Sequence, residues 1–139
     1  MKHTLAVFAA ALWWGSLTTL GFLVVPLLFA GLPTPAMAGG MAARLFSAQC
    51  GVSVACGLLL LLLSRSKEPA ALERWSQGAI VFIVAGLLLA LLVEFGVAPH
   101  IVARDNLALW HRVGSVMYLL QWVCASVVFG KLARASQHS

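Results

Sequence analysis

The sequence predicts an all-α integral membrane protein, a bundle of four transmembrane helices that run up and down. Only 9% of the 139 residues are charged and 62% are hydrophobic, whereas a soluble domain has about 25% charged residues. The apolar runs are long enough to cross about 30 Å of hydrocarbon. Short polar segments separate them, and short connections favour adjacent antiparallel helices. This composition excludes a soluble globule, a disordered chain and a disulfide-stapled secreted domain.

We expect one domain over residues 1–139, with helices over about 4–30, 41–63, 76–97 and 109–130. The turn residues from Gly31 to Pro35 separate the first two helices. A polar stretch from Ser64 to Pro69 ends the second helix. Pro99 ends the third, because the residue before a proline disfavours helical geometry. The two predicted hairpins do not match in sequence, so no internal repeat is expected.

The N-terminal apolar run could be taken for a signal peptide, but it is too long. A signal peptide has an apolar core of about 7–15 residues, and no second spanning segment follows it at once. We therefore expect the first helix to be retained in the membrane.

Basic residues predict the orientation of the bundle. Six lie on the side of the two termini, namely Lys2, Arg65, Lys67, Arg74, Lys131 and Arg134. Three lie on the other side, namely Arg44, Arg104 and Arg112. The side with more Lys and Arg faces the cytoplasm. We therefore expect both termini inside a bacterial cell, with the bundle in the inner (cytoplasmic) membrane.

The net charge of +5 indicates lipid rather than nucleic acid as the partner. The basic residues lie singly or in small groups between apolar runs, where they meet anionic headgroups. They do not form a basic face interleaved with aromatic residues, as nucleic-acid binding requires. A homo-oligomer or a larger membrane complex stays open.

Rows of small residues predict which helix faces pack. Such rows let two backbones approach closely in a membrane. One row has Ala11, Gly15 and Thr19, a second has Ser47, Gly51 and Ala55, and a third has Gly78, Gly86 and Ala90 and continues to Glu94. We interpret these rows mainly as helix-packing surfaces.

Glu94 is the most informative polar residue, because a carboxylate inside a transmembrane helix is costly and is usually paired. Its small-residue ridge predicts that it faces protein. Arg44, His111 and Arg112 are expected on the same side of the membrane. Two interpretations follow: an ion pair that joins the helices, or a proton-accepting or cation-binding pocket open to the outer face.

The histidines raise a weaker hypothesis of a metal or haem. His111 shares an inward stripe with Ser115 and Tyr118, and His100 could join it at a metal, although no zinc-ligand spacing is present. Haem b or copper bound through His3 and His111 is the alternative. However, these two residues are expected on opposite sides, about 25–30 Å apart, which prevents joint ligation of one iron within a monomer.

The three cysteines, Cys50, Cys56 and Cys124, lie within predicted helices. Their number is odd and their spacing is not that of a redox motif, so we expect packing residues rather than disulfides. No catalytic constellation can be assembled from the remaining residues.

Several short motifs carry a resemblance over essentially the whole chain. They are Trp14-Gly15, Pro26, Phe29, Leu32-Pro33, Ala38-Gly39, Arg44-Leu45-Phe46 and Leu109-Trp110-His111-Arg112 with Gly114-Ser115. They resemble a bacterial family of unknown function related to transmembrane protein 205, which implies a four-helix membrane protein without an established activity. Through His3 and Trp14-Gly15 the chain is more distantly similar to copper-resistance D-type membrane domains and to the membrane protoporphyrinogen oxidase that binds haem.

Three functional hypotheses follow. The favoured one is a non-enzymatic membrane protein of unknown activity that handles a small solute or cation, or serves as an accessory subunit, with Glu94, Arg44, His111 and Arg112 as the candidate site. The second is a redox protein that binds haem or copper. The third is a structural subunit that packs through its small-residue faces.

Overall fold

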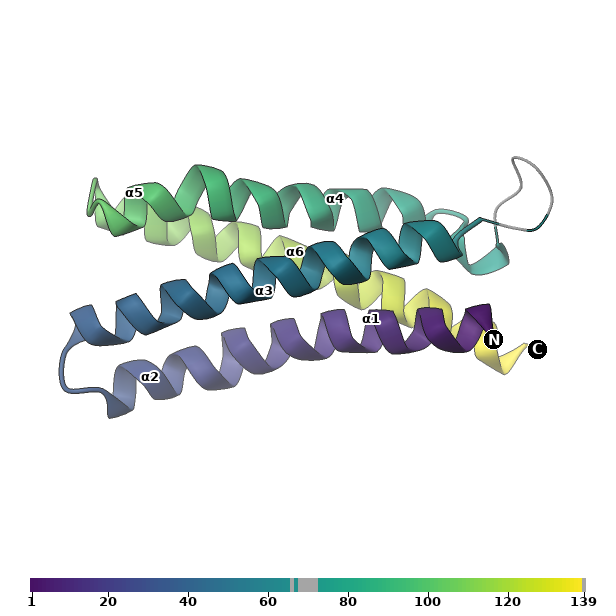
Figure 1. Cartoon of the computed structure of the whole chain (residues 1–139), viewed down its shortest axis with the longest axis horizontal. Coiled ribbons are helices and arrows are strands. Elements are labelled where there is room, and N and C mark those ends of the chain that lie inside the picture. Colours follow the sequence, from purple (N-terminus) through teal and green to yellow (C-terminus); the bar gives the residue numbers. More distant parts are fainter. Residues whose placement is uncertain (66, 68–72, 139) are drawn as a thin grey trace.

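The computed structural model describes residues 1–65, 67 and 73–138, and these form an all-α bundle without a β-strand. Four helices are long and apolar enough to cross a membrane: Lys2–Gly31, Pro35–Leu63, Ala79–Val102 and Leu107–Gln137. They run up and down, so both ends of the chain lie at the same end of the bundle (Figure 1). We call this the terminal end and the opposite one the hairpin end. The predicted fold class is confirmed.

Two of the four spans contain a π-helical turn. The first span consists of α1 (Lys2–Thr19), the π turn η1 (Leu20–Val24) and α2 (Val25–Gly31), and the second is α3 (Pro35–Leu63). After the short 3-10 turn η2 (Arg74–Ser76), the third span consists of α4 (Ala79–Leu92), the π turn η3 (Val93–Val97) and α5 (Ala98–Val102). The fourth span is α6 (Leu107–Gln137).

The second span begins at Pro35 rather than at 41. The Thr34 hydroxyl caps the helix by accepting a hydrogen bond of 3.2 Å from the Met37 amide. Pro35 suits the first helical turn, where its missing N–H would have no partner. The helix therefore starts before Gly39-Gly40, and α6 likewise extends beyond its predicted limits of 109 and 130.

The third span starts at Ala79 and does not end before Pro99 as predicted. A proline lacks the N–H that would bond to the carbonyl four residues earlier, which here belongs to Phe95, inside η3. A local π adjustment lets a membrane helix accommodate such a proline. The helix therefore continues to Val102. Pro26 has the same relation to η1 in the first span.

The two hairpins repeat the same order of features, although their sequences show no repeat. Each first helix has a π turn followed by a proline. Each second helix follows a polar N-cap residue, Thr34 or Asn106, and buries a glutamine, Gln49 or Gln121. The first helix of each hairpin contacts the second helix of the other, α1 with α6 and α4 with α3. The two hairpins are thus alike in the order of their features, while their sequences do not match.

The terminal half of the bundle has a closed apolar core. Its largest fully buried apolar side chains are Trp13, Leu17, Leu60, Ile83, Val128 and Leu132. Trp13 packs against Gly86 so closely that a Cβ on the glycine would lie 2.6 Å from the Trp13 atoms Cη2 and Cζ2. Gly86 and Ala90 therefore pack as predicted, whereas Gly78 of the same predicted row is exposed and precedes α4 as its N-cap residue.

The glycines of the other two small-residue rows do not pack against another helix of the chain. Gly15 and Gly51 have open space where a Cβ would lie, with nothing within 4 Å. Thr19 and Ala55 are exposed. The prediction was wrong for these faces, because a row of small residues does not by itself determine how a helix is rotated in the bundle.

A buried polar network joins three helices near the middle of the bundle. Gln121 Nε2 donates to Ser53 Oγ at 2.9 Å, and Gln49 Nε2 donates to Ser16 Oγ at 2.9 Å and to Ser53 Oγ at 3.4 Å. Lipid offers these amides no hydrogen-bond partner, so each must find one inside the protein. The network therefore links α1, α3 and α6.

We predict that Gly86→Ala lowers the free energy of unfolding by about 1–3 kcal/mol, because the added methyl group overpacks the core against Trp13. Gly15→Ala is the matched control. It has open space and should be neutral or slightly stabilising, because alanine favours a helix. Thermal unfolding in detergent compares the two variants, and equal melting temperatures would contradict the packing described.

We predict that Ser53→Ala destabilises the bundle by about 1 kcal/mol, since it removes the shared acceptor of Gln49 and Gln121. Ser126→Ala is the control, because the Ser126 hydroxyl donates only to the Trp122 carbonyl of its own helix. Chemical unfolding of both variants tests the difference. A Ser53→Ala protein as stable as the control would show that the network contributes little.

Candidate functional site

A cavity of about 350 Å³ lies between the two hairpins at the hairpin end. This volume falls within the range of about 300–1,000 Å³ that is typical of ligand pockets. Most of the wall is carbon, and its polar side chains are Glu94, His111, Ser115 and Tyr118. Figure 1 shows the α2–α3 pair diverging from α5 and α6 at this end.

The π turns and small residues together make room for the cavity. Gly21 and Phe22 of η1 line one part, and Val93, Glu94 and Val97 of η3 line another. Small residues complete the wall: Gly39, Ala42 and Ala43 on α3 and Gly114 on α6. The cavity therefore depends on the same local helix distortions that accommodate the two prolines.

Glu94 lies on η3 at the wall of the cavity and is half-buried. Because the span continues to Val102, Glu94 is about 12 Å inside the helix end, deeper than the sequence predicts. The Ser47 hydroxyl donates a hydrogen bond of 2.8 Å to its Oε1 atom. Sequence reasoning assigned Ser47 to a packing row and missed this role.

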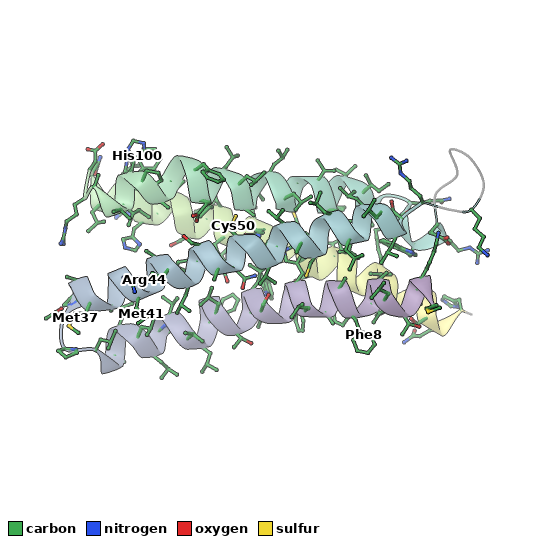
Figure 2. All side chains as sticks on the ribbon, viewed as in Figure 1. Phe8, Met37, Met41, Arg44, Cys50 and His100 are labelled. Carbon is green, nitrogen blue, oxygen red and sulfur yellow. The ribbon has the colours of Figure 1, made fainter. Side chains whose placement is uncertain are left out.

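No arginine within residues 1–65, 67 and 73–138 forms an ion pair with Glu94. Arg44 and Arg112 are exposed and do not line the cavity, although both lie at the hairpin end. Figure 2 shows Arg44 on α3 at this end. Of the predicted set, the structure brings only Glu94 and His111 to one cavity. The arrangement thus favours a pocket over an ion pair that joins the helices.

His3 lies at one end of the bundle, and His100 and His111 lie at the other. His3 lies at the terminal end, with its Nε2 atom 2.6 Å from Ser136 Oγ. His100 lies at the hairpin end (Figure 2), where its ring stacks on Trp110 at 4.1 Å and its Nδ1 atom lies 3.4 Å from Asp105 Oδ2. In the described part of the chain, no three His, Cys, Asp or Glu residues gather as metal ligands. His3 and His111 lie near the starts of α1 and α6, at opposite ends of the bundle.

Two aromatic rings form the inner wall of the cavity. Phe46 and Tyr118 pack edge to face with 5.4 Å between ring centroids. The Tyr118 hydroxyl donates to the Leu17 carbonyl at 2.6 Å, and its ring covers Gly21, where a Cβ would lie 2.5 Å from Tyr118 Cε1. Only a glycine at position 21 permits this close approach.

A small void of about 20 Å³ adjoins the cavity, since Glu94 and Tyr118 line both. Gln49, Cys50 and Gln121 also line it. It has room for one water molecule. The void therefore lies between the cavity and the two glutamines of the buried polar network.

Sequence reasoning missed Gln49 and Gln121, which it did not weigh as site residues. The signal was present, since both amides interrupt apolar runs at membrane depth, where polar residues deserve a functional hypothesis. Both side chains are uncharged, so a search for charged residues at membrane depth does not find them.

Comparison with known proteins gives a family but no activity. A family described as a domain of unknown function (DUF4149) matches residues 8–108. This range includes both π turns, Ser47 and Glu94, whereas His111 lies beyond it. No curated protein and no solved structure matches the chain. The chain belongs to the DUF4149 family, whose function is unknown.

Proposed function

We propose that this multi-pass membrane protein binds a small, largely apolar solute in the cavity at the hairpin end. The single observation that carries the proposal is the cavity of about 350 Å³, which both hairpins enclose within their membrane-length helices. Apolar walls with a few convergent polar groups are typical of small-molecule sites. Here Glu94, His111 and Ser115 are such groups.

The unequal packing of the two halves supports this proposal. Fully buried side chains such as Trp13, Leu60 and Leu132 fill the terminal half, so a solute can enter only from the hairpin end or from the surrounding lipid. The site is therefore closed toward the terminal end of the bundle in this conformation.

We also propose that the protein lies in a bacterial cytoplasmic membrane with both termini inside, and that its family is related to transmembrane protein 205. The larger number of basic residues at the terminal end supports the orientation. The short motifs around Trp14-Gly15 and Leu109-Trp110-His111-Arg112 support the relationship.

Filling the cavity should abolish binding. Gly39 lines the cavity and has nothing within 4 Å of an added Cβ, so Gly39→Leu places a side chain in the open space. We expect the variant to lose at least about tenfold in affinity for solutes that bind the wild type, because the leucine occupies the volume they need. Binding to the full chain in lipid nanodiscs provides the measurement.

Gly51→Leu is the matched control for this experiment. Gly51 lies on the same helix and also has open space around it, but it does not line the cavity. This variant should bind like the wild type. If Gly39→Leu binds as tightly as Gly51→Leu, the cavity is not the binding site.

Cysteine labelling tests the orientation. In a variant without the three native cysteines, Asn106→Cys should react with a membrane-impermeant maleimide added outside intact cells, and Gln137→Cys should react only after lysis. These positions lie at opposite ends of the bundle. Labelling of Gln137→Cys in intact cells would reverse the proposed orientation.

A further inference from the structure

We infer that the solute is an organic cation, an ammonium ion with apolar substituents, whose charge lies beside Glu94. The inference rests on the proposed function, because it names the chemical class that the same cavity takes.

The first argument is the unbalanced charge of the wall. Among the described residues that line the cavity, Glu94 is the only carboxylic acid, and no lysine or arginine lines it. The hydrogen bond from Ser47 orients the carboxylate but adds no positive charge. A carboxylate at membrane depth is costly without a counter-charge. A bound cation would supply that charge.

The second argument is the aromatic surface next to the carboxylate. Phe46 and Tyr118 line both the cavity and the small void together with Glu94. Aromatic rings attract quaternary and other ammonium ions through their π faces. The Tyr118 hydroxyl already donates to the Leu17 carbonyl, so its proton is not free for a solute, and its ring is the part that a solute meets.

The third argument comes from the repeat of the two hairpins. Glu94 is the second residue of η3, and its counterpart, the second residue of η1, is Gly21. Tyr118 covers Gly21 with its ring, whereas the equivalent position in the other hairpin places a carboxylate at the cavity. Only the η3 position of this equivalent pair therefore carries a carboxylate at the cavity. One carboxylate matches a solute with a single positive charge.

The fourth argument separates an organic cation from a metal ion. Hard metal ions take six or more oxygen ligands, while most of this wall is carbon from residues such as Phe22, Val97 and Leu119. Apolar substituents around an ammonium nitrogen fit such a wall, because their burial is favourable.

Two isosteric probes test the inference. Benzyltrimethylammonium carries a positive charge, and neopentylbenzene has a carbon in place of the nitrogen. Binding of each to the full chain in nanodiscs is measured against protein-free nanodiscs, which correct for partition into lipid. We expect the wild type to bind the cation at least about tenfold more tightly than the neutral probe.

Glu94→Gln should remove this preference. Glutamine keeps the size of the side chain and can still accept the Ser47 hydrogen bond, so affinity for the cation should fall at least about tenfold while affinity for the neutral probe stays constant. Glu73→Gln, which removes a negative charge near the terminal end, is the control and should change neither. Glu94→Asp should retain the preference for the cation. Because this variant keeps the negative charge, it shows whether Glu94→Gln loses affinity through the missing charge or through misfolding.

Equal binding of the two probes to the wild type, or unchanged cation binding by Glu94→Gln, would overturn the inference. In either case, loss of both probes from the Gly39→Leu variant would leave the proposed binding function standing. If both probes bind Gly39→Leu as well as Gly51→Leu, the proposed function fails as well, so the two failures are distinguishable.

Discussion

Two prolines within membrane-spanning helices shape the half of this protein that contains the cavity. Pro26 and Pro99 each leave a carbonyl without its helical N–H partner in a solvent that supplies none. A π turn precedes each proline, and these two turns bring Gly21 and Glu94 to the wall of the cavity. The cavity and its carboxylate thus depend on how the helices accommodate two missing hydrogen bonds.

The two buried glutamines follow the same constraint, since a polar group in a membrane has no water to bond and needs a partner inside the protein. Among the described residues, the buried indole N–H of Trp13 is an exception, because it has no hydrogen-bond partner. Gln49 and Gln121 meet this requirement through Ser16 and Ser53. Glu94 meets it only in part, because Ser47 donates one hydrogen bond and no arginine of the described chain pairs with it. This contrast separates the structural polar groups from the candidate binding group.

The two ends of the bundle accordingly differ in character. The terminal half packs around Trp13, which fits against Gly86, and a tight core of this kind holds the hairpins together. At the hairpin end glycines and alanines line part of the wall beside larger apolar side chains, and the same two hairpins leave about 350 Å³ between them. The packed terminal half holds the cavity at the hairpin end open. This arrangement suits a binding site, because the walls of the cavity keep their positions without a bound solute.

The sequence by itself determined the fold class, because long apolar runs with few charges are stable only as helices in lipid. It also identified Glu94 and His111 as neighbours, since up-and-down connectivity places them at one end of the bundle. Only the tertiary structure decided that Arg44 and Arg112 stay outside the cavity, that Ser47 reaches Glu94, and that Phe46 and Tyr118 line the wall. One physical reason is helix rotation: a membrane helix that is apolar on all sides can face its neighbours in several ways, and packing contacts decide among them. The other is local winding, because a proline either ends a helix or is accommodated by a π turn.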